Sequence, residues 1–271
     1  MSQKVRLDSL VFARGFADSR ERAKAIIMAG EVYVDNQKAD KPGMQVPENA
    51  KLEVRGGLRY VSRGGLKLEK AMQVFPISLD GAVTMDIGAS TGGFTDCMLQ
   101  NGAKKVYAID VGYGQLAWKL RTDPRVVNLE RTNVRYLTAE QVPEETDFFS
   151  VDVAFISLKL VLPVAHRFLK PSGTAVCLVK PQFEAGREKV GKKGVVRDPA
   201  VHLEVLEEIT SFVQEAGFSI LGLTYSPVRG PEGNIEYLLY LQKAEVPQSV
   251  PLALKDVVEE SHRVLNGGGA K

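Results

Sequence analysis

The stretch at residues 85–96, MDIGASTGGFTD, constrains the fold more than any other part of the chain. Residues up to Ile87 predict a strand, the glycines that follow predict a tight loop, and the residues from Phe94 onward predict a helix. A strand, a glycine loop and a helix in this order are typical of α/β sheets, which bind ligands beyond the carboxyl ends of their strands. A phosphate, a dinucleotide and a sulfonium nucleoside all remain open as the ligand at this point.

Strand-like and helix-like segments alternate along the rest of this part of the chain. Short apolar runs predict buried strands at residues 83–87, 105–110, 126–129, 150–156 and 174–179. Two later segments, residues 218–228 and 234–243, predict an antiparallel hairpin at the sheet edge. Between them and the earlier strands, Asp198-Pro199 begins a long helix that Gly217 ends. The alternation predicts an α/β fold with a Rossmann-like, doubly wound sheet of about seven strands.

Residues 1–60 have the pattern of a separate, small α+β domain. Residues 5–16 and 20–29 have helical spacing, and residues 31–37 and 50–57 predict short strands. The segment holds eleven Lys and Arg against eight Asp and Glu, and several of the cations gather around the start of the second helix. A solvated helix face and an RNA-binding surface both fit this cluster. The candidate RNA-binding residues are Arg14, Arg20, Arg22 and Lys24, together with Arg63.

A glycine-rich joint at residues 55–65 separates this segment from the predicted α/β domain, residues 61–245. Residues 246–271 predict a C-terminal helix and a disordered tail. The N-terminus lacks the apolar core of a signal peptide, and the most apolar long stretch, residues 151–165, is too short and too polar to span a bilayer. The two cysteines, Cys97 and Cys177, suit a reducing compartment. We therefore expect a cytoplasmic monomer with no membrane partner.

The glycine loop itself discriminates among the three ligands. It lacks the lysine that a P-loop carries after its last glycine, and Gly88 does not begin a G-x-G-x-x-G pattern. Asp86 would repel a pyrophosphate but would stabilise a sulfonium and an amino group. Asp110 closes the second strand of the sheet, where an acid commonly binds ribose hydroxyls. These features favour S-adenosylmethionine over a loop that merely turns the chain.

The predicted chemistry is methylation of an alcohol. A methyltransferase acting on a pyrimidine carbon needs a cysteine after the fourth strand, and one acting on an exocyclic amine favours an Asn-Pro-Pro-aromatic loop there; this chain has neither. Charged residues instead stand at strand or helix ends, namely Lys67, Asp152, Lys180 and Glu236. A lysine can take the proton of an alcohol if its pKa falls from the ordinary value near 10.4. We predict that Lys180, assisted by Lys67, is this proton acceptor, while the two acids orient the lysines and hold the sulfonium.

Several stretches together resemble the TlyA family of ribosomal-RNA cytidine 2′-O-methyltransferases, which belong to the wider FtsJ class and are often labelled hemolysins. The stretches are RYVSRGGLKLEKA, DIGASTGGFTDCMLQNGAKKVYAIDVGYGQL, DVAFISL, LVKPQFEAG and GNIEYLL. The front segment, SRERAKAIIMAGEVYVDNQKADKPGMQV, resembles the small RNA-binding module of a ribosomal small-subunit protein, pseudouridine synthases and tyrosyl-tRNA synthetases. The likeness covers about residues 5–241. It implies 2′-O-methylation of ribosomal RNA at cytidine, with S-adenosylmethionine as cofactor and ribosomal RNA or ribosomal subunits as partner.

The resemblance also implies roles for single residues. The Lys-Asp-Lys-Glu tetrad of the FtsJ class falls on the same Lys67, Asp152, Lys180 and Glu236. The cofactor contacts of the family fall on Asp86, Gly88, Ser90, Gly92, Phe94, Asp110 and Asn133. One departure is Tyr60 in the joint, where some family members carry tryptophan. A basic stretch at residues 180–197, with six Lys and Arg and two Glu, is predicted to be a mobile lid over RNA.

Two alternatives from other functional classes remain at this stage. One is an RNA-binding protein with an inactive methyltransferase domain, and the other is a membrane-lytic hemolysin, which the absence of an amphipathic or spanning segment disfavours. A small-molecule methyltransferase would leave the front RNA module without a purpose. His166, His202 and His262 are isolated in the sequence, and no metal site is predicted.

Overall fold

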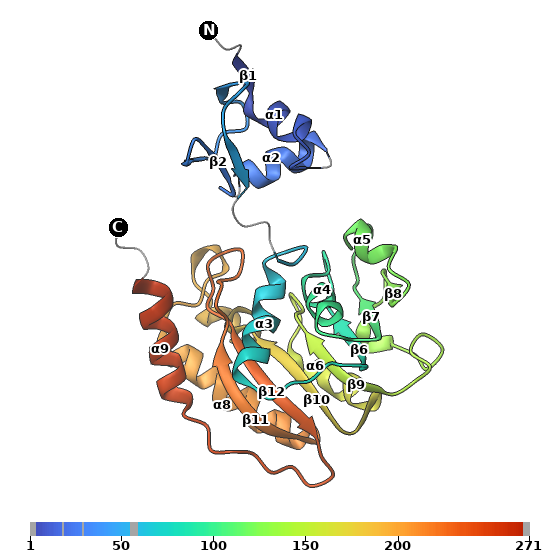
Figure 1. Cartoon of the computed structure of the whole chain (residues 1–271). Helices are drawn as coiled ribbons and strands as arrows, with labels where there is room; N and C mark the ends of the chain where they lie inside the picture. The colour runs from blue at the N-terminus through green and yellow to red at the C-terminus, as the bar shows by residue number, and fades with distance from the viewer. Residues whose placement is uncertain (1–3, 18, 29, 55–58, 268–271) are drawn as a thin grey trace. The chain divides into compact units, whose positions relative to one another are not determined.

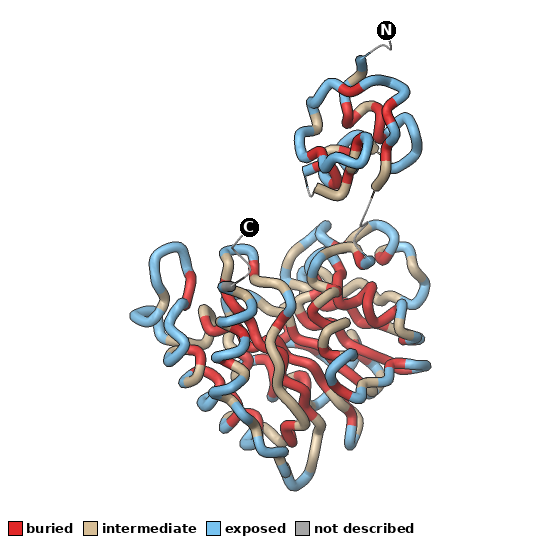
Figure 2. The backbone as a smooth tube through the Cα atoms, turned by 60° about the vertical axis from the view of Figure 1, so that its left-hand side comes forward, coloured by how far each residue is buried: buried red, intermediate tan, exposed pale blue. Residues whose placement is uncertain are grey.

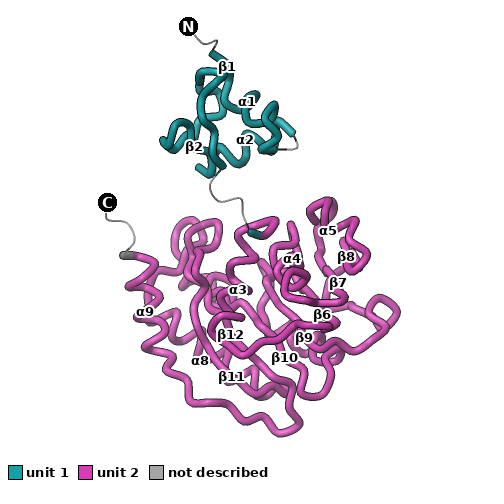
Figure 3. The backbone as a smooth tube through the Cα atoms, viewed as in Figure 1, with its two compact units in different colours: residues 1–59 teal, residues 60–271 magenta. Residues whose placement is uncertain are grey.

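The computed structural model describes residues 4–17, 19–28, 30–54 and 59–267 and divides the chain into two compact units, residues 1–59 and 60–271 (Figures 1 and 3). Much of the predicted glycine-rich joint, residues 55–58, and the predicted tail from residue 268 lie outside the described residues. Tyr60 of the joint is buried in the second unit, where its hydroxyl donates to Glu69 at 3.1 Å.

The first unit packs two helices against short antiparallel strands. Its elements are β1 (Lys4–Arg6), α1 (Leu7–Ala13), α2 (Arg20–Met28), β2 (Val32–Val34), β3 (Gln37–Ala39), β4 (Gln45–Pro47) and β5 (Leu52–Val54). Strand β2 pairs with β3 and β5, and β1 pairs with β4. Leu7, Ile27 and Val32 are fully buried in its core. The prediction of a helix from residue 5 is wrong at its start, because Val5 and Arg6 pair with β4.

The second unit is a seven-stranded sheet. Its strands are β6 (Val83–Ile87), β7 (Lys105–Ile109), β8 (Val126–Leu129), β9 (Thr146–Val151), β10 (Leu169–Val179), β11 (Phe218–Tyr225) and β12 (Tyr237–Lys243). They lie in the order β11-β12-β10-β9-β6-β7-β8. Only β12, among the described strands, runs against the others, and it forms the predicted hairpin with the edge strand β11. The predicted α/β fold and strand number are therefore confirmed.

Helices cover both faces of this sheet. The longer ones are α3 (Gly64–Val74), α4 (Gly93–Gln100), α6 (Leu158–Arg167), α8 (Pro199–Glu215) and α9 (Leu254–Gly267), and the shorter are α5 (Trp118–Arg121), α7 (Pro181–Glu184), η1 (Val134–Tyr136), η2 (Arg187–Lys189) and η3 (Lys192–Gly194). Side chains of α3, α4 and α5 share one apolar core with the sheet, and those of α6, α8 and α9 share the other. Figure 2 shows the buried strands running between these layers.

The direction of the strands brings distant residues to one edge. The carboxyl ends of β6, β7, β9 and β10 meet there because these strands are parallel. Strand β12 runs the other way, so its amino end reaches the same edge, and Tyr237 pairs with Val179. Lys180 directly follows Val179 and Glu236 directly precedes Tyr237, so the two charged residues come next to the same pair of positions on neighbouring strands. The strand predicted at residues 150–156 is wrong at both ends, since β9 begins at Thr146 and Phe155 has a φ of +63°, which a strand cannot accommodate.

Candidate active site

The glycine loop joins β6 to α4 at the sheet edge where the parallel strands end. Gly88 has a φ of +88°, and a Cβ on it would lie 2.5 Å from the carbonyl oxygen of Asp152. Only glycine therefore lets the ends of β6 and β9 approach this closely. Gly92 has a φ of +94°, and a Cβ there would lie 2.2 Å from the side chain of Leu120. Gly92 packs against α5 and is not among the residues that line the cavity described below.

Asp86, the acid before this loop, is completely buried. One of its carboxylate oxygens accepts hydrogen bonds from the Thr95 backbone N–H at 2.9 Å and the Thr95 hydroxyl at 2.7 Å. The other accepts from the Ser150 hydroxyl at 3.0 Å. Burial raises the pKa of Asp86 to about 6, although these hydrogen bonds oppose the shift. Asp86 thus ties the start of α4 to the sheet, and it is one of the residues around the cavity described below.

Asp110 organises the next loop in a similar way. One carboxylate oxygen accepts from the Ser90 backbone N–H and the other from the Gly112 backbone N–H, both at 2.7 Å. This links the glycine loop after β6 with the loop after β7. Asn133, after β8, accepts a hydrogen bond from the Arg135 backbone N–H at 3.1 Å and so begins η1. Asp110 therefore ties the first two loops together, and the third turns into η1 after β8.

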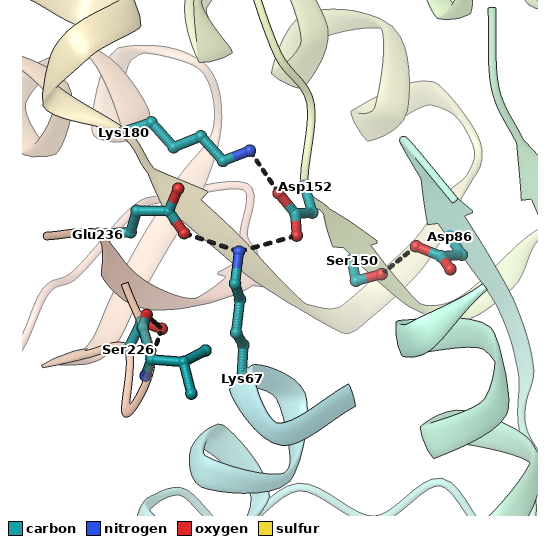
Figure 4. Close-up of polar contacts among 8 residues, drawn as sticks. Lys67, Asp86, Ser150, Asp152, Lys180, Ser226 and Glu236 are labelled. Atoms are coloured by element: carbon teal, nitrogen blue, oxygen red, sulfur yellow. Dashed lines mark hydrogen bonds and ion pairs between the residues drawn. The ribbon is translucent and has the colours of Figure 1, made fainter. Parts of the chain in front are cut away.

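Four charged side chains meet beside these loops, one from α3 and three from positions next to the ends of β9, β10 and β12 (Figure 4). Lys67 of α3 lies 2.7 Å from a Glu236 oxygen and 3.2 Å from one oxygen of Asp152. Lys180 lies 2.5 Å from the second oxygen of Asp152. The side chain of Glu236 is 1% exposed and that of Lys67 is 10% exposed. The structure thus brings together the four residues predicted to be catalytic, in a linear order of Lys180, Asp152, Lys67 and Glu236.

The charges of this cluster compensate one another. Burial disfavours the charge of Lys67, but the neighbouring carboxylates of Asp152 and Glu236 outweigh it, and the pKa of Lys67 is raised. Burial likewise opposes ionisation of Asp152, yet Lys67 and Lys180 lower its pKa. The cluster therefore favours the carboxylate form of Asp152 at its centre and the cationic form of Lys67 between two carboxylates.

A cavity of about 980 Å³ opens between the loops and this cluster. It is large enough for a nucleoside-sized cofactor and part of a second ligand. The predicted site residues that line it are Arg63, Lys67, Asp86, Gly88, Ser90, Phe94, Asp110, Asn133, Asp152, Lys180 and Glu236.

Sequence reasoning missed other residues of this cavity. Phe155 lines it, yet its side chain is 90% exposed and lies against Phe183 with the ring centroids 5.0 Å apart. Arg135 and Arg229 line it too, and Arg229 donates to the Leu265 carbonyl at the end of α9 at 2.6 Å. The sequence does hold one signal for Phe155, because this aromatic residue comes three positions after Asp152, an acid predicted to stand at a strand end.

The predicted RNA-binding residues of the first unit lie on or near α2, apart from Arg14. Arg20 and Arg22 are exposed and Lys24 is half-buried. The guanidinium of Arg14 instead donates to the backbone carbonyls of Glu48 and Ala50, so it also holds the turn before β5.

The basic stretch at residues 180–197 folds into the short helices α7, η2 and η3. Val195 and Val196 are buried, and Asn234 accepts from the Val196 N–H at 3.0 Å and donates to the Gly194 carbonyl at 2.9 Å. The end of this stretch is therefore anchored to the second unit. Its mobility as a lid stays a prediction.

Two of the histidines that are isolated in the sequence lie close together in the structure. His202 of α8 and His262 of α9 lie 3.3 Å apart between ring nitrogens, and His202 also contacts the Tyr237 hydroxyl at 2.7 Å. Burial lowers the pKa of His202 to about 4. In the described part of the chain, no helix has the length and apolar character needed to cross a membrane.

The chain is similar in sequence and structure to proteins of a known family. The model of the FtsJ-like methyltransferase family matches residues 60–243, and that of the S4 domain matches residues 5–52. YqxC of Bacillus subtilis, provisionally named an rRNA methyltransferase, is 54% identical over 97% of this chain and 96% of its own length. The 16S/23S rRNA (cytidine-2′-O)-methyltransferase TlyA of Mycobacterium tuberculosis is 42% identical over 99% of this chain and 100% of its own. A solved structure from Streptococcus thermophilus, named as a hemolysin, covers 98% of both chains at 48% identity with a TM-score of 0.78.

Proposed function

The chain belongs to the FtsJ-like methyltransferase family, and on this premise we propose that it methylates a ribose 2′-hydroxyl of ribosomal RNA with S-adenosylmethionine. The observation that carries the proposal is the cluster of Lys67, Asp152, Lys180 and Glu236 on the wall of the cavity beside the glycine loop. The cluster supplies an amine that can accept the proton of an alcohol, and a carboxylate that can stabilise the positive charge of the protonated amine. The names of the curated relatives support cytidine as the target nucleoside and ribosomal RNA as the substrate.

The residues around the glycine loop fit the cofactor. Gly88 has no side chain at the cavity, the negative charge of the buried Asp86 carboxylate favours a cationic methionine end nearby, and Asp110 follows β7 where ribose hydroxyls are usually bound. Ser90, Phe94 and Asn133 complete this wall. When bound, S-adenosylmethionine supplies an electrophilic methyl group.

The chain's own part in the reaction is to hold the hydroxyl and take its proton. Lys180 first releases a proton to solvent. Its Nζ then accepts the proton of the hydroxyl, and Asp152, whose carboxylate lies 2.5 Å from Nζ, pairs with the ammonium that is restored. The low pKa of Asp152 keeps it ionised, so it does not compete for the proton. Lys67 bridges Asp152 and Glu236 and prevents the Asp152 carboxylate from turning away from Lys180.

RNA binding is assigned to both units. The S4 domain carries the exposed Arg20 and Arg22, and Arg63 lines the cavity in the second unit. The exposed ring of Phe155 at the cavity is suited to stacking on an unpaired base.

The test is direct mapping of the product. Purified protein is incubated with ribosomal RNA from cells that lack this gene and with S-adenosylmethionine, and nuclease fragments are analysed by mass spectrometry. We expect a single class of product, 2′-O-methylcytidine. A methyl group on a base, or cofactor binding without any transfer, would contradict the proposal, and the second outcome would identify an inactive domain.

A further inference from the structure

One part of the second unit carries exposed aromatic rings alongside arginines. Tyr113 and Trp118 follow β7, and Tyr136 follows β8 in η1; their side chains are 67%, 76% and 70% exposed. The two loops are joined where the Arg131 N–H donates to the Gly112 carbonyl at 2.9 Å. We define the β7–β8 rim surface as Tyr113, Trp118, Arg131, Arg135 and Tyr136.

This surface adjoins the cavity. The same two loops contribute Val111, Gln115 and Asn133 to the cavity wall, and Arg135 belongs both to the wall and to the rim surface. Helix α5, which begins with Trp118, lies beside β8 at the end of the sheet (Figure 1). A polymer with one nucleotide in the cavity could therefore continue over these side chains.

The arginines are arranged over the rings. The guanidinium carbon of Arg131 lies 4.1 Å from the ring centroid of Tyr113, and that of Arg135 lies 5.4 Å from the centroid of Tyr136. Arg131 has a φ of +56°, a conformation that residues other than glycine rarely adopt. The N–H of Thr132 donates to the Asp110 carbonyl at 2.9 Å and the Arg131 N–H to Gly112, so the backbone is pinned on both sides of this strained position.

The nearby acids do not neutralise these two arginines. Glu130 accepts from Arg121 at 2.7 Å, and Asp96 pairs with Lys119 at 2.8 Å. Within the described ranges, neither Arg131 nor Arg135 has a carboxylate partner. Exposed aromatic rings beside guanidinium groups that have no carboxylate partner are features that bind unpaired nucleotides, through stacking and through contacts with phosphates. Protein interfaces are also rich in Tyr, Trp and Arg, so what favours RNA here is the position of the surface beside the cavity proposed to hold a nucleotide, which Arg135 also lines.

We propose that the β7–β8 rim surface binds single-stranded RNA that flanks the nucleotide in the cavity. This rests on the proposed function, but it assigns RNA contact to a surface separate from the S4 domain and from residues 180–197. Bases stack on Tyr113, Trp118 and Tyr136, and Arg131 and Arg135 hold the phosphates between them.

Trp118 is the single tryptophan of the chain, so its fluorescence reports on this surface alone. The full chain is titrated with an oligocytidylate of about 12 nucleotides, a length within the span of stacking surfaces. Total binding is followed in parallel by the anisotropy of a dye on the RNA. We expect saturable quenching of Trp118 with the same midpoint as the anisotropy, and protection of Trp118 from acrylamide in the complex.

Variants locate the contact. Tyr113→Ala and Arg131→Ala should each weaken binding about 10-fold, the loss of one stacking or phosphate contact. Arg263→Ala, an exposed arginine of α9, should leave binding unchanged. Bound RNA without quenching of Trp118, no binding of RNA, or a Trp118 already protected in the free chain would overturn the proposal; the last would show that protein covers the surface.

The binding experiment does not depend on methyl transfer. A chain that quenches normally on RNA but transfers no methyl group would contradict the proposed function and leave the rim surface standing. A chain that methylates ribosomal RNA at an unchanged rate after Tyr113→Ala and Arg131→Ala would refute the rim surface alone.

Discussion

Replacing Lys67 by methionine tests whether the buried charges hold one another in place. The side chain of Glu236 is 1% exposed, and its ion pair with Lys67 spans 2.7 Å. Lys67→Met leaves this carboxylate buried without a cation, which costs about 3–5 kcal/mol. The double variant, Lys67→Met with Glu236→Gln, removes both charges and leaves the ion pair of Asp152 and Lys180, which has no net charge. The double variant should therefore be more stable than Lys67→Met by about 2 kcal/mol.

The measurement is thermal and urea unfolding at neutral pH, followed by circular dichroism. For a unit the size of residues 60–271, a loss of about 3 kcal/mol lowers the Tm by on the order of 10 °C. Glu236→Gln alone completes the double-mutant cycle, and Lys170→Met, at the other end of β10 in a pair with Asp147, serves as the control. The reasoning is refuted if Lys67→Met is as stable as the parent, or if the two substitutions destabilise additively.

Three further predictions concern the cavity. Burial raises the pKa of Asp86 to about 6, and a cationic cofactor favours the ionised carboxylate. Calorimetry should therefore find that the affinity for S-adenosylmethionine is unchanged above about pH 6 and about 10-fold lower near pH 5. Asp86→Asn should abolish this pH dependence, and an affinity that does not change with pH in the parent protein would contradict the prediction. Gly88→Ala places a Cβ 2.5 Å from the Asp152 carbonyl oxygen at a φ of +88° and should cost about 2 kcal/mol or more in urea unfolding, whereas parent-like stability would show that the two strand ends can separate freely. Phe155→Ala removes a ring that is 90% exposed, so stability should change by less than about 0.5 kcal/mol. Methyl transfer to ribosomal RNA should fall about 10-fold in the same variant, and an unchanged rate would exclude base stacking on this ring.

The sheet and the meeting of the charged residues could be predicted because both follow from chain direction. Parallel strands end at one edge, so acids and lysines at strand ends gather there. Lys67 and Glu236 are 169 positions apart and still bond, since α3 packs on the sheet and β12 runs in reverse. The family resemblance placed the same four residues together, and their roles in the reaction stay predictions.

Features that depend on tertiary packing were beyond the sequence. Phe155 looks like one more residue of a strand, and only its positive φ and exposed ring separate it from the core. The contact of His202 with His262 depends on how α8 and α9 pack. The sequence also could not show that the Asp86 carboxylate accepts hydrogen bonds from Thr95 and Ser150, because these contacts depend on the three-dimensional positions of the three residues.

The most direct test of the central claim is the single-turnover rate of methyl transfer by Lys180→Met. Asp152 keeps Lys67 as a partner at 3.2 Å in this variant, so the cavity should stay folded and bind S-adenosylmethionine with a Kd within about twofold of the parent. The account predicts that the transfer rate to ribosomal RNA falls by about 100-fold or more, while Lys170→Met transfers at the parent rate. A Lys180→Met protein that methylates at the parent rate would contradict the assignment of the proton acceptor.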